Sequence, residues 1–410
     1  MDGSKGVLGR LPRGVWALGI VSLLMDVSSE MIHALLPVYL VTVLGTSMVA
    51  VGAIEGIAEA TAAITKIFSG VLSDRLGRRK ILVAIGYGLA AFTKPVFPLA
   101  PSVGWLVGAR FVDRIGKGIR GAPRDALLAD LAPPDLRGAA FGLRQSLDTV
   151  GAFVGPLVAI VLMAATGDGF RTVFWVAVVP GLLALALIVF AVEEPARPAA
   201  QAVVNPLEPA ALRRLGATFR WVVAVAAIFT LARFSEAFLV LRAQDVGLPI
   251  ALVPAVLVAM NVVYAAVATP AGILSDRLGR FGLLFVGLVL LVVADLVLAL
   301  VPTLVGVALG VVAWGLHLGL TQGIFAALIA DTAPAELRGT AFGVFNLACG
   351  VAMLAASVIA GFAWDRVGPQ GTFLAGALFS VAALVAAVPL RRRLAAEVRA
   401  REAAIGRGAG

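Results

Sequence analysis

Long apolar stretches separated by short polar loops dominate the pattern along the chain. A helix that spans a bilayer needs about 20 mainly apolar residues. Twelve stretches meet this length, at roughly 14–44, 48–72, 81–100, 102–122, 138–164, 171–192, 219–242, 250–273, 281–301, 303–328, 338–362 and 371–390. The first is long and lacks a small-residue cleavage site, so we interpret it as a retained helix rather than a signal peptide. The pattern predicts an all-α membrane protein with twelve transmembrane helices.

Composition narrows the class of protein further. Of the 410 residues 60% are hydrophobic and 14% charged, whereas a soluble domain has about a quarter of its residues charged. This excludes an ordinary cytosolic enzyme, a disordered chain and a disulfide-stapled secreted module. Cys349 is the single cysteine and cannot form an intrachain disulfide. We find no phosphate-binding loop, zinc-spaced His/Cys cluster or Gly-x-Ser-x-Gly element, and we expect neither enzymatic activity nor a cofactor or metal.

The positions of Lys and Arg predict the orientation in the membrane. Basic residues gather in the N-terminal tail, in alternate loops and after the last span, while the loops near 45–47, 98–104 and 302 hold almost none. Cytoplasmic loops carry this excess, so we expect a bacterial inner-membrane protein with both termini in the cytoplasm. The net charge of +9 then reflects topology and indicates no nucleic-acid partner. The tail at 393–410 is expected to be an amphipathic helix near anionic headgroups.

An internal repeat divides the chain into two halves. Gly70-Val-Leu-Ser-Asp-Arg-Leu-Gly-Arg recurs 202 positions later from Gly272, and the segment 126–142 recurs 201 positions later at 327–343. Two ungapped matches at nearly equal offsets predict two parallel six-helix bundles. We expect them at 1–192 and 218–392, joined by a cytoplasmic linker at 193–217. Nothing in the sequence requires more than a monomer.

The repeated loop resembles the signature loop of the major facilitator superfamily, and the resemblance covers the whole chain. It implies two bundles that rock about a central cavity, with the loops as a latch of the outward-facing state. The residues concerned are Gly70, Asp74, Arg75, Gly77, Arg78, Arg79, Gly272, Asp276, Arg277, Gly279 and Arg280. The arginines can reach carboxylates such as Asp125 or Asp130; for Arg79 a plain positive-inside bias is an equally good explanation. Phe281 replaces the second arginine in the second copy, so its latch is expected to be weaker.

Ionisable residues inside the predicted spans are the main indication of mechanism. A charge at mid-bilayer costs about 3 kcal/mol or more, so such residues face a cavity or a partner. A buried carboxylate can carry a proton, because burial disfavours its charged form and an approaching base favours it. The proton-coupling residues we predict are Asp26, Glu30, Glu55, Glu59, Asp113 and Arg114.

Further polar residues are predicted to line a substrate cavity. They are His33, Lys117, Arg144, Gln145, Asp148, Arg233, Glu236, Asn261, Tyr264, His317, Gln322 and Asn346. Two alternatives stay open: Asp148 pairs with Arg144 within its own helix, and His317 is bonded between helices rather than facing a ligand. The second half is poorer in charge, which places ion coupling in the first bundle.

Two short motifs resemble elements of the drug-exporting, proton-antiporting branch of the family. Arg114-Ile-Gly-Lys-Gly resembles its arginine-glycine motif, with Lys117 where Gln is frequent, and Gly151-x-x-x-Gly155-Pro156 resembles its glycine-proline element. Paired glycines allow close helix packing and proline permits a bend. We therefore expect a secondary transporter that exports a small organic molecule or drug in exchange for protons. The alternatives are a metal-ion or metal-chelate exporter that uses the first-helix acids, and a non-transporting membrane sensor.

Overall fold

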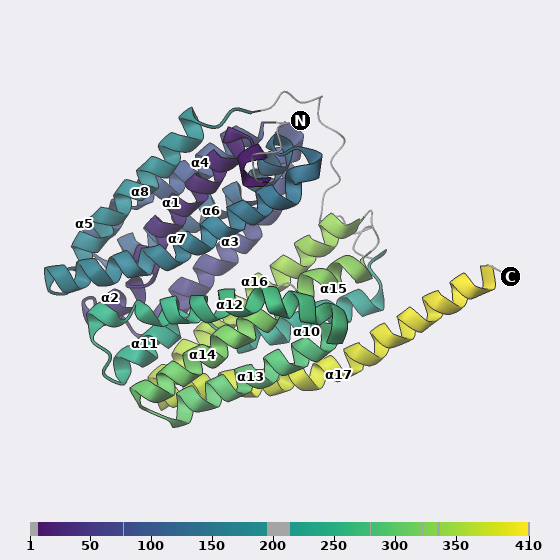
Figure 1. Cartoon of the computed structure of the whole chain (residues 1–410). Coiled ribbons are helices and arrows are strands. Elements are labelled where there is room, and N and C mark those ends of the chain that lie inside the picture. The colour runs from purple at the N-terminus through teal and green to yellow at the C-terminus, as the bar shows by residue number, and fades with distance from the viewer. Residues whose placement is uncertain are drawn as a thin grey trace. The chain divides into compact units, whose positions relative to one another are not determined.

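The computed structural model describes residues 7–76, 78–194, 214–278, 280–321, 324–333 and 337–408. Side chains are described throughout these ranges except at 7, 8, 71, 74, 75, 269, 272–278, 280, 326, 327, 330, 331, 338, 339 and 394–408. All the regular structure in these ranges is helical and no strand occurs in them. The prediction of an all-α membrane fold is confirmed (Figure 1).

The chain divides into two compact units, of which the first comprises 1–204 and 235–262. Its helices are α1 (Arg13–His33), α2 (Leu36–Thr42), α3 (Met48–Leu76), α4 (Arg79–Thr93), α5 (Val96–Leu99), α6 (Val103–Leu131), α7 (Arg137–Thr166) and α8 (Phe170–Phe190), with α11 (Ala237–Asp245) and the start of α12 (Ala255–Leu278). Short 3-10 turns lie at Val7–Arg10, Pro134–Leu136 and Ile250–Leu252. In this unit α1 packs against α7 and α8, while α6 packs against α3 and α4.

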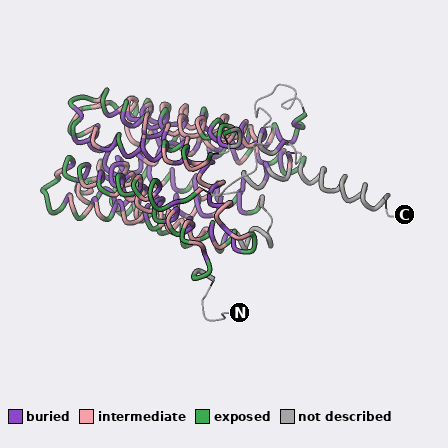
Figure 2. Tube along the Cα trace, turned by 90° about the horizontal axis from the view of Figure 1, so that it is seen from above, coloured by how far each residue is buried: buried purple, intermediate pink, exposed green. Residues whose placement is uncertain are grey.

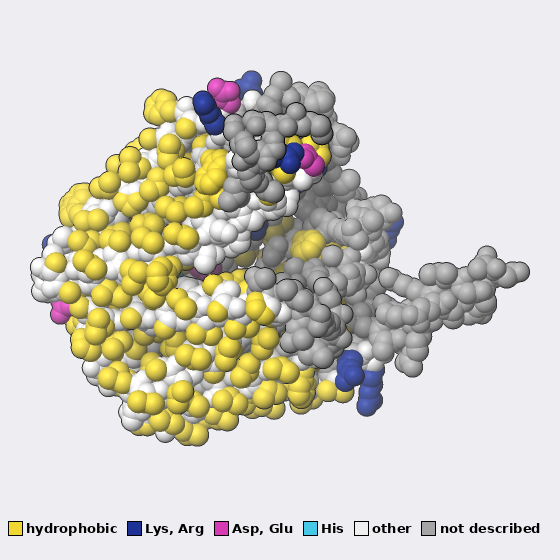
Figure 3. All heavy atoms as spheres, in the orientation of Figure 1, with side chains coloured by type: hydrophobic (Ala, Val, Ile, Leu, Met, Phe, Trp, Pro, Cys, Tyr) yellow, Lys and Arg dark blue, Asp and Glu magenta, His cyan; other side chains and the backbone are white. Residues whose placement is uncertain are grey.

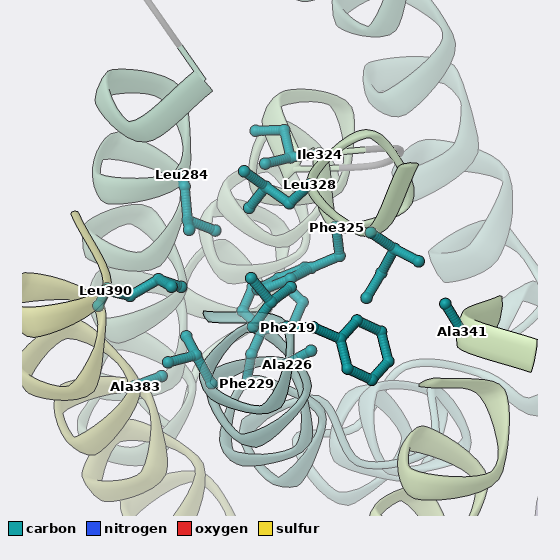
Figure 4. Packing of buried hydrophobic residues seen from close by; sticks show 14 of the residues in the cluster. Phe219, Ala226, Phe229, Leu284, Ile324, Phe325, Leu328, Ala341, Ala383 and Leu390 are labelled. Carbon is teal, nitrogen blue, oxygen red and sulfur yellow. The ribbon is translucent and has the colours of Figure 1, made fainter. Parts of the chain in front are cut away.

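The second unit comprises 205–234 and 263–410. It contains α10 (Ala217–Ala232), the rest of α12, α13 (Arg280–Leu300), α14 (Leu304–Thr321), α15 (Ile324–Thr332), α16 (Arg338–Val367) and α17 (Pro369–Gly408). Its core is apolar: Phe219, Phe229 and Phe325 pack with aliphatic side chains of α13, α15 and α17 (Figure 4). Close van der Waals packing of such side chains holds the helices of this unit together, because lipid tails are as apolar as the side chains themselves.

Eleven helical segments in the described part of the chain are long and apolar enough to cross a membrane. The predicted span at 102–122 is missing from this set. It corresponds to α6, whose buried side includes Arg110, Asp113, Arg114 and Arg120. Helix α6 is therefore the charged helix of the first unit, and α3 and α4 cover it.

Three predicted spans are interrupted, and proline or polar residues lie at each interruption. The span 14–44 breaks between α1 and α2 just before Pro37, and the span 81–100 breaks at Lys94 and Pro95. A proline has no N–H to continue a helix and disfavours helical geometry in the residue before it. The span 219–242 breaks between α10 and α11 at 233–236.

The outer surface of the helices is apolar, as a bilayer requires. Phe92, Phe190 and Leu378 are among the large hydrophobic side chains that are exposed. Figure 3 shows hydrophobic side chains covering most of the described surface in view, with charged ones few and near its edges. Buried and exposed residues alternate along the long helices (Figure 2), so these helices have a face toward their own unit and a face toward lipid.

Candidate functional site

The candidate site lies in the first unit, along the charged side of α6. From Arg110 to Arg124 this helix rises about 21 Å, at 1.5 Å per residue, which is most of the hydrocarbon thickness of a bilayer. Ionisable side chains recur along it at helical spacing, and most of them meet a partner from α1, α3, α4 or the α4–α5 break. The result is a column of charged side chains inside the unit.

One end of this column is a cluster of Glu55, Arg110 and His33. The Arg110 guanidinium donates from Nη2 to Glu55 Oε2 at 2.8 Å and to His33 Nδ1 at 2.6 Å. Arg110 and Glu55 are buried. His33 therefore accepts a hydrogen bond from a fixed cation. Glu55, predicted as a proton-coupling residue, is held by Arg110 at this end of the column.

The middle of the column joins two acids and two bases. Lys94 Nζ lies 3.0 Å from Asp113 Oδ1 and donates to Ser29 Oγ at 3.1 Å. Arg114 Nη1 lies 3.4 Å from Glu59 Oε1, and its Nε lies 3.9 Å from the other oxygen of Asp113. Lys94, Asp113 and Arg114 are buried, whereas the Glu59 side chain is 38% exposed. Glu59 is thus the accessible member of this group.

Two acids of α1 differ from the others because they pair with no residue in the described part of the chain. Asp26 and Glu30 are half-buried, and neither makes a hydrogen bond or an ion pair with a residue that the structure describes. Lys117 on α6, an exposed side chain, lies within electrostatic range of Asp26, as do Asp148 and Arg120. These carboxyls have a base nearby without being fixed to it.

Two glycines of α7 allow that helix to pack closely against the part of α1 that carries these acids. A methyl group at Gly151 would lie 2.7 Å from Leu23 O and 2.9 Å from Asp26 Cβ. At Gly155 it would lie 2.8 Å from Val27 O and 2.9 Å from Glu30 Cβ. No larger residue fits either position without a shift of α7, so the two glycines and the two acids form one interface. Pro156 follows directly and is buried within α7.

The other end of the column is built around Tyr87. The Arg120 guanidinium lies over its ring at 4.7 Å from the centroid, and the phenol oxygen lies 3.4 Å from Ser22 Oγ. Arg124 donates to the same Ser22 oxygen at 3.1 Å. Arg120 and Ser22 thus place polar groups beside Tyr87, in a region that is otherwise apolar core of α1 and α4.

Arg144 and Asp148 pair within α7, which was one of the two alternatives for Asp148. Arg144 also donates to Gln145 Oε1 at 3.0 Å and lies 3.8 Å from Asp125 Oδ1. Arg144 is buried and Gln145 exposed. Through its contact with Asp125, the Arg144–Asp148 pair connects α7 to α6.

Part of the predicted latch can be described. Arg79 donates from Nη1 to Asp130 Oδ2 and to Ala126 O, both at 2.6 Å, so the start of α4 is tied to the end of α6. Arg78 precedes α4 and is exposed, and Gly70 contacts Ala122. The remaining predicted latch positions, Asp74, Arg75, Gly77, Gly272, Asp276, Arg277, Gly279 and Arg280, lie outside the described residues or their side chains do.

The predicted cavity residues of the second half are scattered. His317 is buried in the second unit; its Nδ1 bonds to Gly287 O at 2.8 Å and its ring lies against Phe229, which is the interhelical bonding that the sequence left open beside a cavity position. Arg233 lies over the same Phe229 ring, 5.6 Å from the centroid. Glu236, Asn261, Tyr264 and Asn346 are half-buried, and Gln322 lies outside the described residues.

Lys94 and Arg110 are absent from the predicted set although they hold Asp113 and Glu55. Arg110 precedes Asp113 by three positions and Arg114 by four, so its place on the charged side of α6 was open to prediction. Lys94 sits directly before Pro95 in an apolar stretch. Its role depends on a helix break and on Asp113 of another helix, and no local pattern shows either.

Among the residues described, no three His, Cys, Asp or Glu side chains lie close enough together to hold a metal ion. The acids of α3, Glu55 and Glu59, meet Arg110 and Arg114 of α6 in place of one another.

Eleven apolar spans together with a charged column inside one unit define a multi-spanning membrane protein that handles polar groups within the bilayer. The profile of the Major Facilitator Superfamily matches residues 18–357 and 237–407, and the chain belongs to this family of membrane transporters. An MFS-type transporter of Methanocaldococcus jannaschii is 32% identical over 379 residues, which cover 90% of this chain and 93% of that protein.

Other similar proteins agree with this assignment. The inner membrane transport protein YajR of Escherichia coli is 27% identical over 404 residues, covering 92% of this chain and 83% of the relative. A solved structure of the peptide transporter POT superposes with a TM-score of 0.77 at 18% identity, over 94% of this chain and 95% of that one. The latter likeness concerns the fold alone.

Proposed function

We propose that this transporter is a proton-coupled exporter of a small organic molecule or drug, which works by alternating access. The family supplies the transporter class; the coupling ion, direction and substrate class are inferred from the first unit and from its two antiporter-like motifs. The observation that carries the proposal is the contrast among its acids. Glu55, Glu59 and Asp113 each meet a base, whereas Asp26 and Glu30 have none among the described residues.

Asp26 is the proton carrier in this proposal, with Glu30 one helical turn away. A carboxyl in a site of low dielectric takes up a proton readily, and an approaching cation favours its release. Lys117 is exposed and within electrostatic range of Asp26, so a small movement of α6 relative to α1 changes that balance. A cationic substrate group that approaches Asp26 would displace its proton in the same way, which gives exchange.

Glu59, Arg114, Gln145 and Lys117 are proposed to contact the substrate. Lys117 and Gln145 are exposed and the Glu59 side chain is 38% exposed, whereas Arg114 is buried behind Glu59. An ion pair at 3.4 Å with one accessible member can open to admit a polar ligand at lower cost than the fully buried pairs beside it.

The remaining parts of the proposal concern topology. The two bundles at 1–192 and 218–392, both termini in the cytoplasm of a bacterial cell, and the loop after α3 as a latch follow from the repeat and from the distribution of basic residues. The contact of Arg79 with Asp130 supports the latch, since it ties two helix ends through a partly buried charge pair.

Transport in sealed proteoliposomes tests the proposal. The probes are ethidium as a drug, zinc as a divalent metal and benzoate as an organic acid, each with an imposed pH gradient. We expect gradient-driven movement of ethidium by the unmodified protein and a loss of at least tenfold in Asp26→Asn. Asn keeps the size of Asp26 but cannot exchange a proton, so ethidium exchange without a gradient should persist.

Asp135→Asn is the matched control, because Asp135 lies in an exposed turn and pairs only with the exposed Arg10. It should transport like the unmodified protein. Full gradient-driven flux in Asp26→Asn would refute the role of Asp26, and movement of none of the three probes under any gradient would favour the sensor alternative.

A further inference from the structure

The second unit contains a buried acid, Asp295, that the proposed mechanism does not use. It lies in α13, its exposed fraction is 0%, and neither carboxyl oxygen has a hydrogen-bond partner among the residues described. Helix α13 packs against α14 and α17. A methyl group at Gly376 of α17 would lie 2.7 Å from Asp295 Oδ2 and 2.8 Å from Phe234 Cε1, so the carboxyl points into a tight contact between helices.

The surroundings of Asp295 are aromatic and uncharged. The Phe234 ring packs against Trp314 and Phe373, with centroids 5.4 and 5.6 Å apart. Helix α17 carries no charged residue between Pro369 and Leu390. His317 is the titratable residue of α14; it bonds to Gly287, about two turns along α13 from Asp295. Arg233, beside Phe234, lies over the Phe229 ring instead.

The internal repeat indicates that, among the described residues, Asp295 lacks the counter-ion that the related position in the first unit has. Asp295 follows Lys94 by 201 positions, the offset that separates the repeated segments at 126–142 and 327–343, and Trp314 follows Asp113 by the same 201. Lys94 faces Gly181 of α8, where a methyl group would lie 3.5 Å from its Cγ, as Asp295 faces Gly376. Each unit thus holds one buried ionisable side chain at this place. In the first unit it has Asp113 as its counter-ion; at the same offset the second unit has the uncharged Trp314 in place of an acid or base.

We propose that Asp295 is a proton-binding site of the second unit, in which a bound proton takes the place of the missing counter-ion. An ionised carboxylate with neither a base nor a hydrogen-bond donor is strongly disfavoured in a buried site, whereas the neutral acid is tolerated. The proton is held at neutral pH, so this part of the second unit carries no fixed charge. The inference is independent of the role proposed for Asp26.

Infrared spectroscopy of the full-length protein in lipid tests this directly. The difference spectrum between the unmodified protein and Asp295→Asn at neutral pH should contain the C=O stretching band of a protonated carboxylic acid. Asn has the size of the neutral acid, so the variant should fold normally. A difference spectrum with only the bands of an ionised carboxylate would overturn the proposal.

A second pair of variants restores the counter-ion. Trp314→Lys places an ammonium group at the position that Asp113 occupies in the first unit, and the acid band should disappear as Asp295 ionises. Trp314→Leu, which is apolar, should keep it, and its loss there would contradict the proposal. Should Trp314→Lys fail to fold, the Asp295→Asn spectrum decides alone. Asp26→Asn should leave the band unchanged whatever its transport activity.

Discussion

The ionisable residues of the first unit fall into two groups: those held in buried ion pairs, and those with no ion pair among the described residues. Glu55 and Asp113 meet Arg110 and Lys94 at 2.8 and 3.0 Å in buried surroundings. A buried ion pair contributes little net stability over apolar packing, but removal of one partner leaves an uncompensated charge. The held charges therefore have an energetic reason to stay together, which the free carboxyl of Asp26 lacks.

Removal of the Arg110 side chain should reveal this cost. In Arg110→Leu the Glu55 carboxylate stays buried with no cation, and we expect a loss of about 3–5 kcal/mol of unfolding free energy. The double variant Arg110→Leu with Glu55→Gln should recover most of it, because the charge itself is then gone. Reversible unfolding in detergent micelles measures both.

The control for this pair is Arg10→Leu. It breaks the Arg10–Asp135 contact at 3.3 Å, in which both side chains are more than half exposed. Such a surface pair contributes less than about 1 kcal/mol, so stability should hardly change. An equal loss in Arg10→Leu and Arg110→Leu would contradict the distinction between held and exposed charges.

The acidic residues of the candidate site could be predicted from the sequence more readily than its basic residues. Acids inside apolar stretches stand out, and Asp26, Glu30 and Glu59 were selected on that ground. Their partners depend on which helices pack together, which hydropathy does not contain. Lys94 was missed for this reason, whereas the contact of His317 with Gly287 agrees with the interhelical alternative that the sequence left open.

At the scale of the helices, the position of α7 depends on two glycines, which have no side chain to keep it away from α1. Gly151 and Gly155 bring its backbone against α1 beside Asp26 and Glu30. Small residues at such contacts let helices approach closely inside a membrane. A static contact of this kind also fixes how far each acid projects from α1.

Enlargement of one glycine should separate the two helices. In Gly151→Ala the new Cβ would lie 2.7 Å from Leu23 O, so α7 has to shift, at an expected cost of about 1–3 kcal/mol. Gradient-driven ethidium transport should fall with it. Gly142→Ala, on the same helix with no atom within 4 Å of the new Cβ, should be neutral in both assays. Equal behaviour of the two variants would contradict this role of Gly151.

Most membrane-spanning helices could be predicted from the sequence, whereas the breaks within them could not. Apolar length identified the spans, and even charged α6 was expected from its spacing. The break at Lys94–Pro95 and the one before Pro37 were read as continuous helix. A proline inside a membrane helix is tolerated where neighbours satisfy the freed carbonyls, so the residue alone does not decide between a bend and a break.

At the scale of the whole molecule, two related halves have diverged in charge. The repeat at offsets of 201 and 202 relates their helices, yet the column of ion pairs belongs to the first unit, while the second is built around Phe219, Phe229 and Phe325 (Figure 4). This difference between the halves is consistent with separate roles, in which the charged half couples transport to protons and the apolar half gives structural support.

The orientation of the whole chain can be checked with cysteine labelling. In a background with Cys349→Ser, Ser102→Cys before α6 should react with a membrane-impermeant maleimide added to intact cells. Asp135→Cys, in the turn after α6, should react only after the cells are opened, because basic residues dominate the loops on its side. The reverse pattern would invert the proposed topology.

The ion pairs of α6 also determine how the protein should respond to membrane voltage. An elementary charge that crosses the membrane gains or loses about 2.3 kcal/mol per 100 mV, but a pair such as Lys94–Asp113 that moves as one body carries no net charge through the field. The voltage then acts on the unpaired groups and on the solute itself. An electrical current recorded during turnover would accordingly report exchange at Asp26 and Glu30, with little contribution from the many other ionised side chains beside them.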